Sequence, residues 1–302
     1  MDRKALLVAK VSKNQSVAEM VESLFASNIA YLLSWEALAR SCDDPSGVHQ
    51  FRVALRRMRS LLTLFREVMP SELSLYWRNT MRDLAGELGE ARDLDVLIGE
   101  TLPEVAISQR HPGAELLLQR LERSRSKAYA RVNVMLDGER YRQFRYDFPL
   151  WIATHQWQQR DNPKIVKRLK QSAQRYAYQL LDKRTAKVIK VGGGVDHDDA
   201  EALHQLRIEF KKLRYAAESF APIFPKIDKF LRHGKGMQEL LGSLNDLTVM
   251  DSVLDRVRSG ESATELHHFI GMVSGWQRHR AAALLTEFAQ RWQTFASAQH
   301  SW

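Results

Sequence analysis

The sequence is poor in the residues that cross-link a chain or break its regular structure. Cys42 is the single cysteine among 302 residues, so no disulfide can form within the chain, and we expect a reducing compartment. The 15 glycines and 8 prolines are too few for a turn-rich β-sandwich or barrel. Period-two alternation is missing from any stretch long enough to make a sheet. These absences favour an all-α fold.

Long apolar runs are missing as well. The run at residues 5–9 is shorter than the core of a signal peptide. No later stretch approaches the roughly 20 apolar residues that a membrane-spanning helix needs. We therefore expect a cytoplasmic protein with no membrane partner.

Positive charge is what the chain has in excess. Its 45 lysines and arginines exceed its 36 acidic residues, which gives a formal net charge of +9 at pH 7. The chain is also 44% hydrophobic, a fraction that excludes a disordered chain. A folded protein with this charge balance favours polyanions as partners.

The sequence contains an internal repeat. The string HQFR followed by RRMR, at residues 49–52 and 56–59, returns as HQLR and KKLR with every position shifted by 155. A second block, LGEARDL at residues 88–94, returns as LGSLNDL with a shift of 153. Such self-similarity indicates tandem copies of one structural unit. We divide the chain into a tail at 1–15 and one domain at 16–297, made of repeat one at 16–148, a linker at 149–163 and repeat two at 164–297.

Each repeat is predicted to contain about four helices. Ser16 and Glu19 form a capping-box pattern that opens the first helix, and Pro70 closes the second. Further helices are expected over 72–97, 113–137 and 140–151. The second repeat is expected to open with a helix over 164–191, followed by a flexible glycine connector at 192–194. The predicted fold is all-α, with two four-helix bundles related by a pseudo-twofold axis and a basic groove or channel between them.

The repeated helix carries its cations on one face. At about 100° per residue, one stripe collects one histidine and three arginines, opposite an apolar side that includes Phe51 and Leu55. Like charges at this spacing destabilise a helix, and the stripe of the first repeat has no acid to offset them. Arginine and lysine suit phosphate oxygens, so we expect a bound polyanion. The candidate binding residues are His49, Arg52, Arg56 and Arg59, with His204, Arg207, Lys211 and Arg214 in the second copy.

Other residues lie beside or near this stripe. Glu218 takes the place of Thr63 in the second copy and is expected to shorten the cationic track. The Arg92-Asp93 dipeptide returns as Asn245-Asp246, so we interpret the aspartate as a residue that orients an arginine or caps a turn. The aromatic pairs Tyr141/Trp292 and Phe144/Phe295 are assigned to the core. Six further cations are secondary candidates for binding: Arg57, Arg82, Arg123, Lys212, Lys235 and Arg278.

Together, these motifs resemble the CHAD domain, the conserved histidine α-helical domain. The resemblance covers about residues 16–297 and includes both copies of the His-x-x-Arg string and of the Leu-Gly block. It implies two four-helix bundles around a basic central channel, binding of inorganic polyphosphate, and association with polyphosphate granules. Carried over to this chain, the channel residues are the eight candidates of the two stripes. Free phosphate or sulfate ions are expected to occupy the same site.

Non-catalytic polyphosphate binding, with no cofactor and no metal, is the leading interpretation. Nucleic-acid binding is an alternative that the charge permits, but no helix-turn-helix, zinc-finger or RNP signature is present and the stripe lacks interleaved aromatics. A metal-dependent phosphohydrolase is a weaker alternative, suggested by His197-Asp198 near His204. Its ligand spacing is poor, because neither His49 nor His204 has a carboxylate or second histidine three or four residues later.

Overall fold

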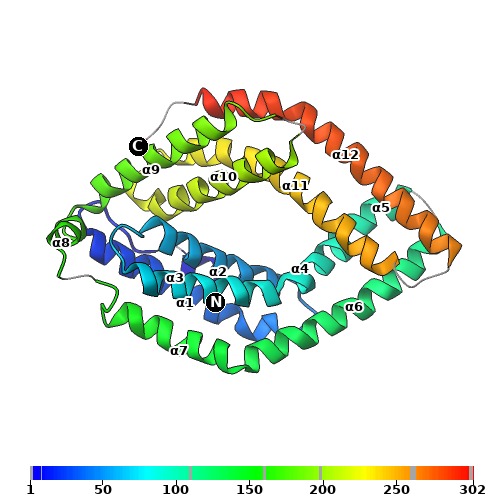
Figure 1. The fold of residues 1–302 in the computed structure, drawn as a ribbon, viewed down its shortest axis with the longest axis horizontal. Coiled ribbons are helices and arrows are strands. Elements are labelled where there is room, and N and C mark those ends of the chain that lie inside the picture. Colours follow the sequence, from blue (N-terminus) through cyan, green and yellow to red (C-terminus); the bar gives the residue numbers. More distant parts are fainter. Residues whose placement is uncertain are drawn as a thin grey trace.

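The structure is a computed structural model that describes residues 3–7, 9–108, 111–158, 161–196, 199–258, 263–298 and 302. Over these ranges the chain is built from helices, with one isolated antiparallel bridge between Ser16 and Ser172 and no strand (Figure 1). The predicted all-α class is confirmed. Among the described residues, no helix combines the length and the apolar character needed to cross a membrane.

The first half of the chain gathers around α2. A short 3-10 helix at Arg3–Leu7 lies on α1, α1 packs along α2, α2 packs on α3, and the long α6 and α7 return past α4 and α1 (Figure 1). The helices have the following bounds: α1 (Val17–Ala39), α2 (Ser46–Leu64), α3 (Ser71–Glu87), α4 (Gly89–Val96), a π-helical turn (Leu97–Thr101), α5 (Leu102–Ser108), α6 (Pro112–Asp137) and α7 (Glu139–Ala153).

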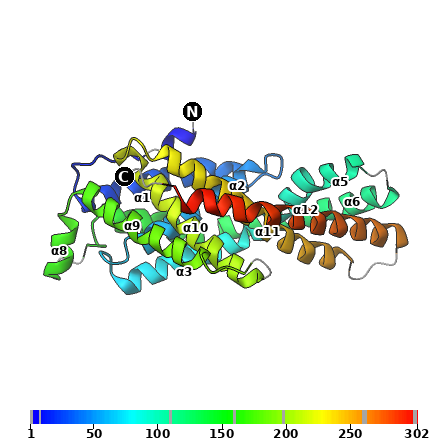
Figure 2. The same cartoon turned by 90° about the horizontal axis from the view of Figure 1, so that it is seen from above.

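The second half gathers around α10. Helix α9 packs on α10, α10 on α11 and α11 on α12, while α12 also runs along α6. Helices α2 and α10 contact each other in the middle of the molecule (Figures 1 and 2). The bounds are α8 (Pro163–Leu169), α9 (Ala173–Gly192), α10 (Ala200–Phe220), a 3-10 turn (Ala221–Ile223), α11 (Asp228–Arg258) and α12 (Thr264–Ala296).

Two predicted helices are interrupted in the structure. The helix expected over 72–97 ends at Glu87 and restarts at Gly89, so that α4 turns away from α3 and packs on α6. The helix expected over 164–191 breaks before Ser172, whose side chain caps α9 by accepting from the Arg175 amide. The helices expected over 113–137 and 140–151 are confirmed, and α7 continues through Pro149 to Ala153.

The starts of α1 and α9 are joined by a reciprocal pair of hydrogen bonds. The Val17 amide donates to the Gln171 carbonyl at 2.9 Å, and the Ala173 amide donates to the Gln15 carbonyl at 2.7 Å. Each helix begins at a serine N-cap, and the predicted capping box at Ser16 is present. Paired contacts of this kind are typical of a twofold axis, as in isologous interfaces. The tandem duplication and its boundaries stay a prediction.

The apolar side predicted for the repeated helix forms the core. Phe51 and Leu55 are fully buried, as are the other apolar residues of that face. Helices α1 and α2 cross so closely that a Cβ on Gly47 would lie 2.2 Å from the Leu38 carbonyl oxygen, which only glycine permits. The aromatic pairs also belong to the core as predicted, with Trp292 packed at its edge.

The first residue of the glycine run at 192–194 differs from the flexible connector that we expected, whereas the other two lie in a turn after α9. Gly192 is the last residue of α9 and is buried. A Cβ there would lie 2.0 Å from the Trp292 ring, so the glycine is required for α9 and α12 to pack. Close approach of a neighbouring helix therefore explains this residue.

A buried ion pair ties α4 to α6. The Arg125 Nε donates to Asp95 Oδ1 at 2.7 Å, and the Tyr129 hydroxyl donates to Asp95 Oδ2 at 2.8 Å. We expect Asp95→Ala to lower the free energy of unfolding by about 3 kcal/mol, because it removes the buried acceptor of Arg125 and Tyr129 and leaves Arg125 only the partly exposed Glu122, 3.4 Å away, as a counter-charge. Urea denaturation followed by circular dichroism measures the loss.

The matched control for this variant is Asp137→Ala. It removes a surface ion pair with Arg40 at 2.9 Å, in which the Asp137 side chain is 69% exposed. The expected loss there is below about 1 kcal/mol. Equal losses for the two variants would show that burial adds nothing to the Asp95 network.

Candidate anion-binding site

Cations from α2, α4 and α10 meet at the centre of the molecule. Arg56 of α2 lies in the electrostatic environment of both Arg207 and Lys211 of α10. Arg52 is coupled to Arg56, Lys211 and Arg92. These five residues, Arg52, Arg56, Arg92, Arg207 and Lys211, are called the central cluster below. The contact between α2 and α10 thus brings cations of the two predicted stripes together, as expected for a groove between them.

The middle of the central cluster lacks acceptors within the described residues. The Nε atoms of Arg56 and Arg207 are buried and have no hydrogen-bond partner. Across the described ranges, no ion pair within 4.0 Å joins Arg56, Arg207 or Lys211 to a carboxylate. Buried guanidinium N–H groups without an acceptor are costly, and they are rare in folded proteins. The Arg56 and Arg207 N–H groups are therefore donors that an acceptor from outside the described residues could satisfy.

The two remaining arginines of the cluster donate hydrogen bonds to residues outside the cluster. Arg52 donates to the Ala85 carbonyl at 2.7 Å, and Arg92 donates to Glu100 at 3.1 Å. A Cβ on Gly89 would lie 3.2 Å from the Arg52 Nη1, so this glycine leaves room for the guanidinium. Gly89 of the repeated Leu-Gly block thereby leaves room for a cation of α2.

Two aspartates border the cluster, one from each copy of that block. Burial raises the pKa of Asp93 on α4, and the nearby charge of Asp246 on α11 raises it further, whereas Arg52 lowers it. Partial enclosure by neighbouring groups raises the pKa of the Asp246 carboxyl, and the charge of Arg207 lowers it. The Asp246 side chain still has contact with solvent. Each aspartate thus faces an arginine of the cluster, in line with the orienting role that we interpreted for it.

The cluster depresses the pKa values of its own members. Burial lowers the pKa of Lys211 to about 7, and Arg207 and Arg56 lower it in the same direction. Burial and then Arg56 lower the pKa of Arg52 to about 10. Enclosure and like-charge repulsion both disfavour the charged form, and a bound anion relieves the repulsion.

The two repeated histidines have different surroundings. His49 is half-buried at the edge of the cluster, and burial followed by Arg92 lowers its pKa to about 4, so it is neutral at pH 7. His204 is exposed and lines a separate groove of about 590 Å³ between α10, α11 and α12. Arg207 and the exposed Arg278 line that same groove.

The ends of the two predicted stripes also differ. Arg59 lies beside Arg78 and Arg82, so α2 continues the positive track beyond the central cluster. On α10, Glu218 accepts from Arg214 at 2.5 Å and also pairs with Arg57 across the contact with α2. Glu218 therefore neutralises the charge of Arg214 within the protein. This is the end of the cationic track that we expected Glu218 to shorten.

All six secondary candidates lie outside the central cluster and are exposed or paired. Lys212 pairs with Glu209 at 2.6 Å, beside a different groove. Arg82 pairs with Asp83 at 3.1 Å and Lys235 with Glu239 at 3.3 Å, both with largely exposed side chains. Arg123 is exposed in a groove of about 320 Å³ that also contains Arg120 and Lys127.

Arg92 and Arg78 are absent from the residues that sequence reasoning selected. Arg92 belongs to the repeated Leu-Gly block, and the recurrence of that block is the signal that identifies it as part of a shared site. Arg78 has no such signal, because its counterpart in the second copy cannot be recognised from the string alone. It is placed near Arg59 only by the packing of α3 on α2.

Metal ligands do not gather in the part of the chain that the structure describes. No group of three or more His, Cys, Asp and Glu side chains there is arranged to hold a metal ion. His197 and Asp198, which suggested the phosphohydrolase alternative, lie outside the described residues.

Two solved structures share this fold. The crystal structure of the CHAD domain from the plant Ricinus communis superimposes with a TM-score of 0.82 at 23% identity, over 98% of this chain and 96% of that one. PptA from Streptomyces chartreusis superimposes with a TM-score of 0.69 at 16% identity, over 92% of this chain and 100% of that one.

Similarity in sequence extends over most of the chain. Uncharacterized proteins from two Mycobacterium tuberculosis strains, CDC 1551 and H37Rv, are each 29% identical over 248 residues, which are 78% of this chain and 45% of each relative. The chain thus spans about half the length of these relatives. The CHAD domain family matches residues 23–255, which include both copies of the basic string and of the Leu-Gly block. The chain therefore belongs to the CHAD domain family.

Proposed function

We propose that this chain binds inorganic polyphosphate at the central cluster and catalyses no reaction on it. The observation that carries the proposal is the electrostatic proximity of Arg56 to Arg207 and Lys211, with two buried guanidinium N–H groups that have no acceptor among the described residues. A chain of phosphates offers closely spaced oxygens to donors of this kind. Arginine binds such oxygens in bidentate geometry, while lysine adds a point charge.

The shape of the site supports a linear ligand. Arg52, Arg56 and Arg59 follow one face of α2, and Arg207 and Lys211 follow the neighbouring face of α10. A linear polyanion meets several of these cations at once and releases its counterions on binding. We further propose that the protein acts in the cytoplasm and that this affinity places it at polyphosphate granules.

Nucleic acid is the ligand against which this proposal must be tested. The cationic face of α2 has no aromatic residue between its arginines on which a base could stack. In calorimetric titrations, we therefore expect long-chain polyphosphate to bind, and tRNA at an equal phosphate concentration to displace it only weakly.

Two results would count against the proposal. Complete displacement by tRNA at equal phosphate concentration would favour nucleic-acid binding. Release of free phosphate from polyphosphate on addition of Mg²⁺ or Mn²⁺ would contradict the non-catalytic role.

A further inference from the structure

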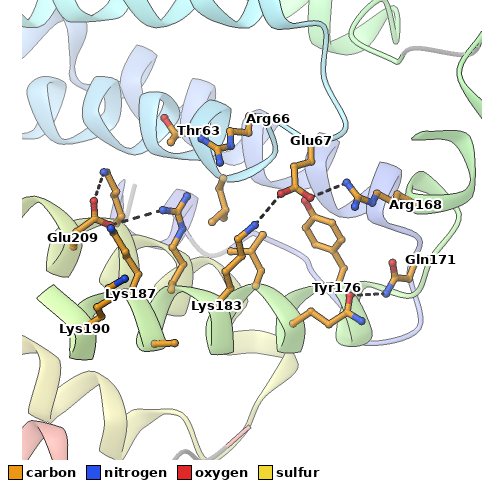
Figure 3. Close-up of a pocket in the computed structure, with 16 residues that line it drawn as sticks. Thr63, Arg66, Glu67, Arg168, Gln171, Tyr176, Lys183, Lys187, Lys190 and Glu209 are labelled. Carbon is orange, nitrogen blue, oxygen red and sulfur yellow. Dashed lines mark hydrogen bonds and ion pairs between the residues drawn. The ribbon is translucent and has the colours of Figure 1, made fainter. Parts of the chain in front are cut away.

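A second basic groove lies on the other side of α10 from the central cluster. It has a volume of about 570 Å³ and is bordered by the end of α2, by α8, α9 and α10 (Figure 3). No residue of the central cluster lines it. It is called the α9 groove below, and its charged lining residues are Arg66, Glu67, Arg168, Lys183, Arg184, Lys187, Lys190, Glu209 and Lys212.

Positive charge dominates the α9 groove. Seven lysines and arginines face two carboxylates. Lys183, Lys187 and Lys190 are spaced four and three residues apart, so they share one face of α9. Figure 3 shows them along one side of the groove, with Arg66 on the other. The lysines of α9 thus line a concave site.

The two carboxylates hold cations at opposite ends of the groove. Glu67 accepts from Arg168 at 2.7 Å and from Lys183 at 3.1 Å (Figure 3). Glu209 pairs with Lys212 at 2.6 Å and with Arg184 at 4.0 Å. These contacts fix side chains from three helices around the groove.

The cations in the middle of the groove are not neutralised by neighbouring carboxylates of the described residues. Among the described residues, no carboxylate lies within 4.0 Å of the charged ends of Arg66, Lys187 or Lys190. Burial lowers the pKa of Arg184, and the nearby charge of Arg66 adds to that effect. Cations that repel one another across a cavity are stabilised by a counter-charge, and a multivalent anion bound in the groove would supply it.

The aromatic floor of the groove limits the kind of anion. Tyr176 is buried and stacked on Phe65, with ring centroids 5.8 Å apart and an interplanar angle of 16°. With one face of its ring stacked on Phe65 and the side chain buried, Tyr176 offers little open surface to a nucleobase. Burial raises the pKa of Tyr176, so its hydroxyl stays protonated and available as a donor. The volume is in the usual range for small-ligand sites.

We propose that the α9 groove binds compact anions that carry several phosphate groups, such as a short inorganic polyphosphate or an inositol polyphosphate. The proposal goes beyond the binding assigned to the central cluster. The phosphates come from one of two sources, a free small molecule or a segment of a longer polyphosphate chain, and the ligand chemistry is the same for both.

The test uses the variant Lys187→Glu/Lys190→Glu, with Lys226→Glu/Lys229→Glu as a control of equal charge change. Lys226 and Lys229 are exposed near the start of α11 and line none of the grooves described above. Both pairs are made in the wild-type chain and in a chain whose central cluster carries Arg56→Glu/Lys211→Glu. Calorimetry is run with tripolyphosphate, inositol hexakisphosphate and long-chain polyphosphate, and melting curves check the fold.

In the chain with the altered central cluster, we expect tripolyphosphate or inositol hexakisphosphate still to bind, and K187E/K190E to weaken that binding by about tenfold or more. That result supports a free small ligand. A loss confined to long-chain polyphosphate supports the polymer as the source. Unchanged affinity for all three probes, or an equal loss in K226E/K229E, overturns the proposal. Because the central cluster is already disabled, these outcomes are independent of its own function.

Discussion

The variant Arg56→Glu/Lys211→Glu is expected to abolish binding of long-chain polyphosphate at the central cluster. Arg56 is coupled to cations of both α2 and α10, and Lys211 is coupled to Arg56, Arg207 and Arg52. Reversing both charges replaces two attractive contacts with two repulsive ones in an enclosed site. Losing contacts of this kind costs at least about 4 kcal/mol, a factor of about a thousand in affinity, in a calorimetric titration at fixed salt.

Three measurements separate this effect from unfolding and from net charge. The variant Arg56→Lys/Lys211→Arg keeps one arginine and one lysine in the cluster and is expected to retain binding at pH 6, where the lysine is charged. The surface variant Lys226→Glu/Lys229→Glu changes the net charge by the same amount and is expected to bind as the wild type does. Melting curves report on the fold, which the new carboxylates should stabilise through Arg52 and Arg207. Unchanged affinity in a folded Arg56→Glu/Lys211→Glu protein would refute the assignment of the site.

Features that depend on neighbouring positions in one helix could be predicted from the sequence. The spacing of Phe51, Leu55 and Met58 identified the buried face of α2, and by elimination it placed Arg52, Arg56 and Arg59 on the opposite side. These predictions succeed because a helix fixes which residues share a face, whatever packs against it.

Individual side-chain pairs between helices, and the breaks that tertiary packing imposes, could not be predicted. No pattern in the neighbouring sequence predicts that Glu218 of α10 forms an ion pair with Arg57 of α2 as well as with Arg214 of its own helix. The breaks at Leu88 and before Ser172 interrupt patterns that continue helically in the sequence, because the tertiary packing of α4 and α9 overrides local preference.

The second copy of the string uses Lys211 where the first has Arg56, and the structure gives this difference a consequence. Both residues lie in the central cluster, but an arginine stays charged at any ordinary pH, whereas a buried lysine does not. The pKa of Lys211 is held at about 7 by burial and by Arg207 and Arg56, with Asp246 opposing and Arg52 adding to the depression. Near neutral pH, much of the free protein therefore lacks this charge.

Polyphosphate binding is accordingly expected to take up protons and to weaken as the pH rises. A bound polyanion favours the charged ammonium and raises the pKa of Lys211 above its value in the free protein. Well below pH 7 the lysine is protonated in both states, so no uptake is expected from it. Between the free and the bound pKa, up to one proton enters with the ligand, and the affinity falls by more than about tenfold between pH 7 and pH 9.

Calorimetry in buffers with different ionisation enthalpies measures this proton uptake, and Lys211→Arg isolates its source. The arginine keeps its charge over this range, so the variant should bind polyphosphate with little proton uptake and with a nearly flat pH profile from 7 to 9. The wild type and Lys211→Arg should converge at pH 6, where both side chains are charged. A wild-type profile as flat as that of the variant would show that Lys211 is already charged before the ligand arrives. The depressed pKa would then be excluded as the link between pH and binding.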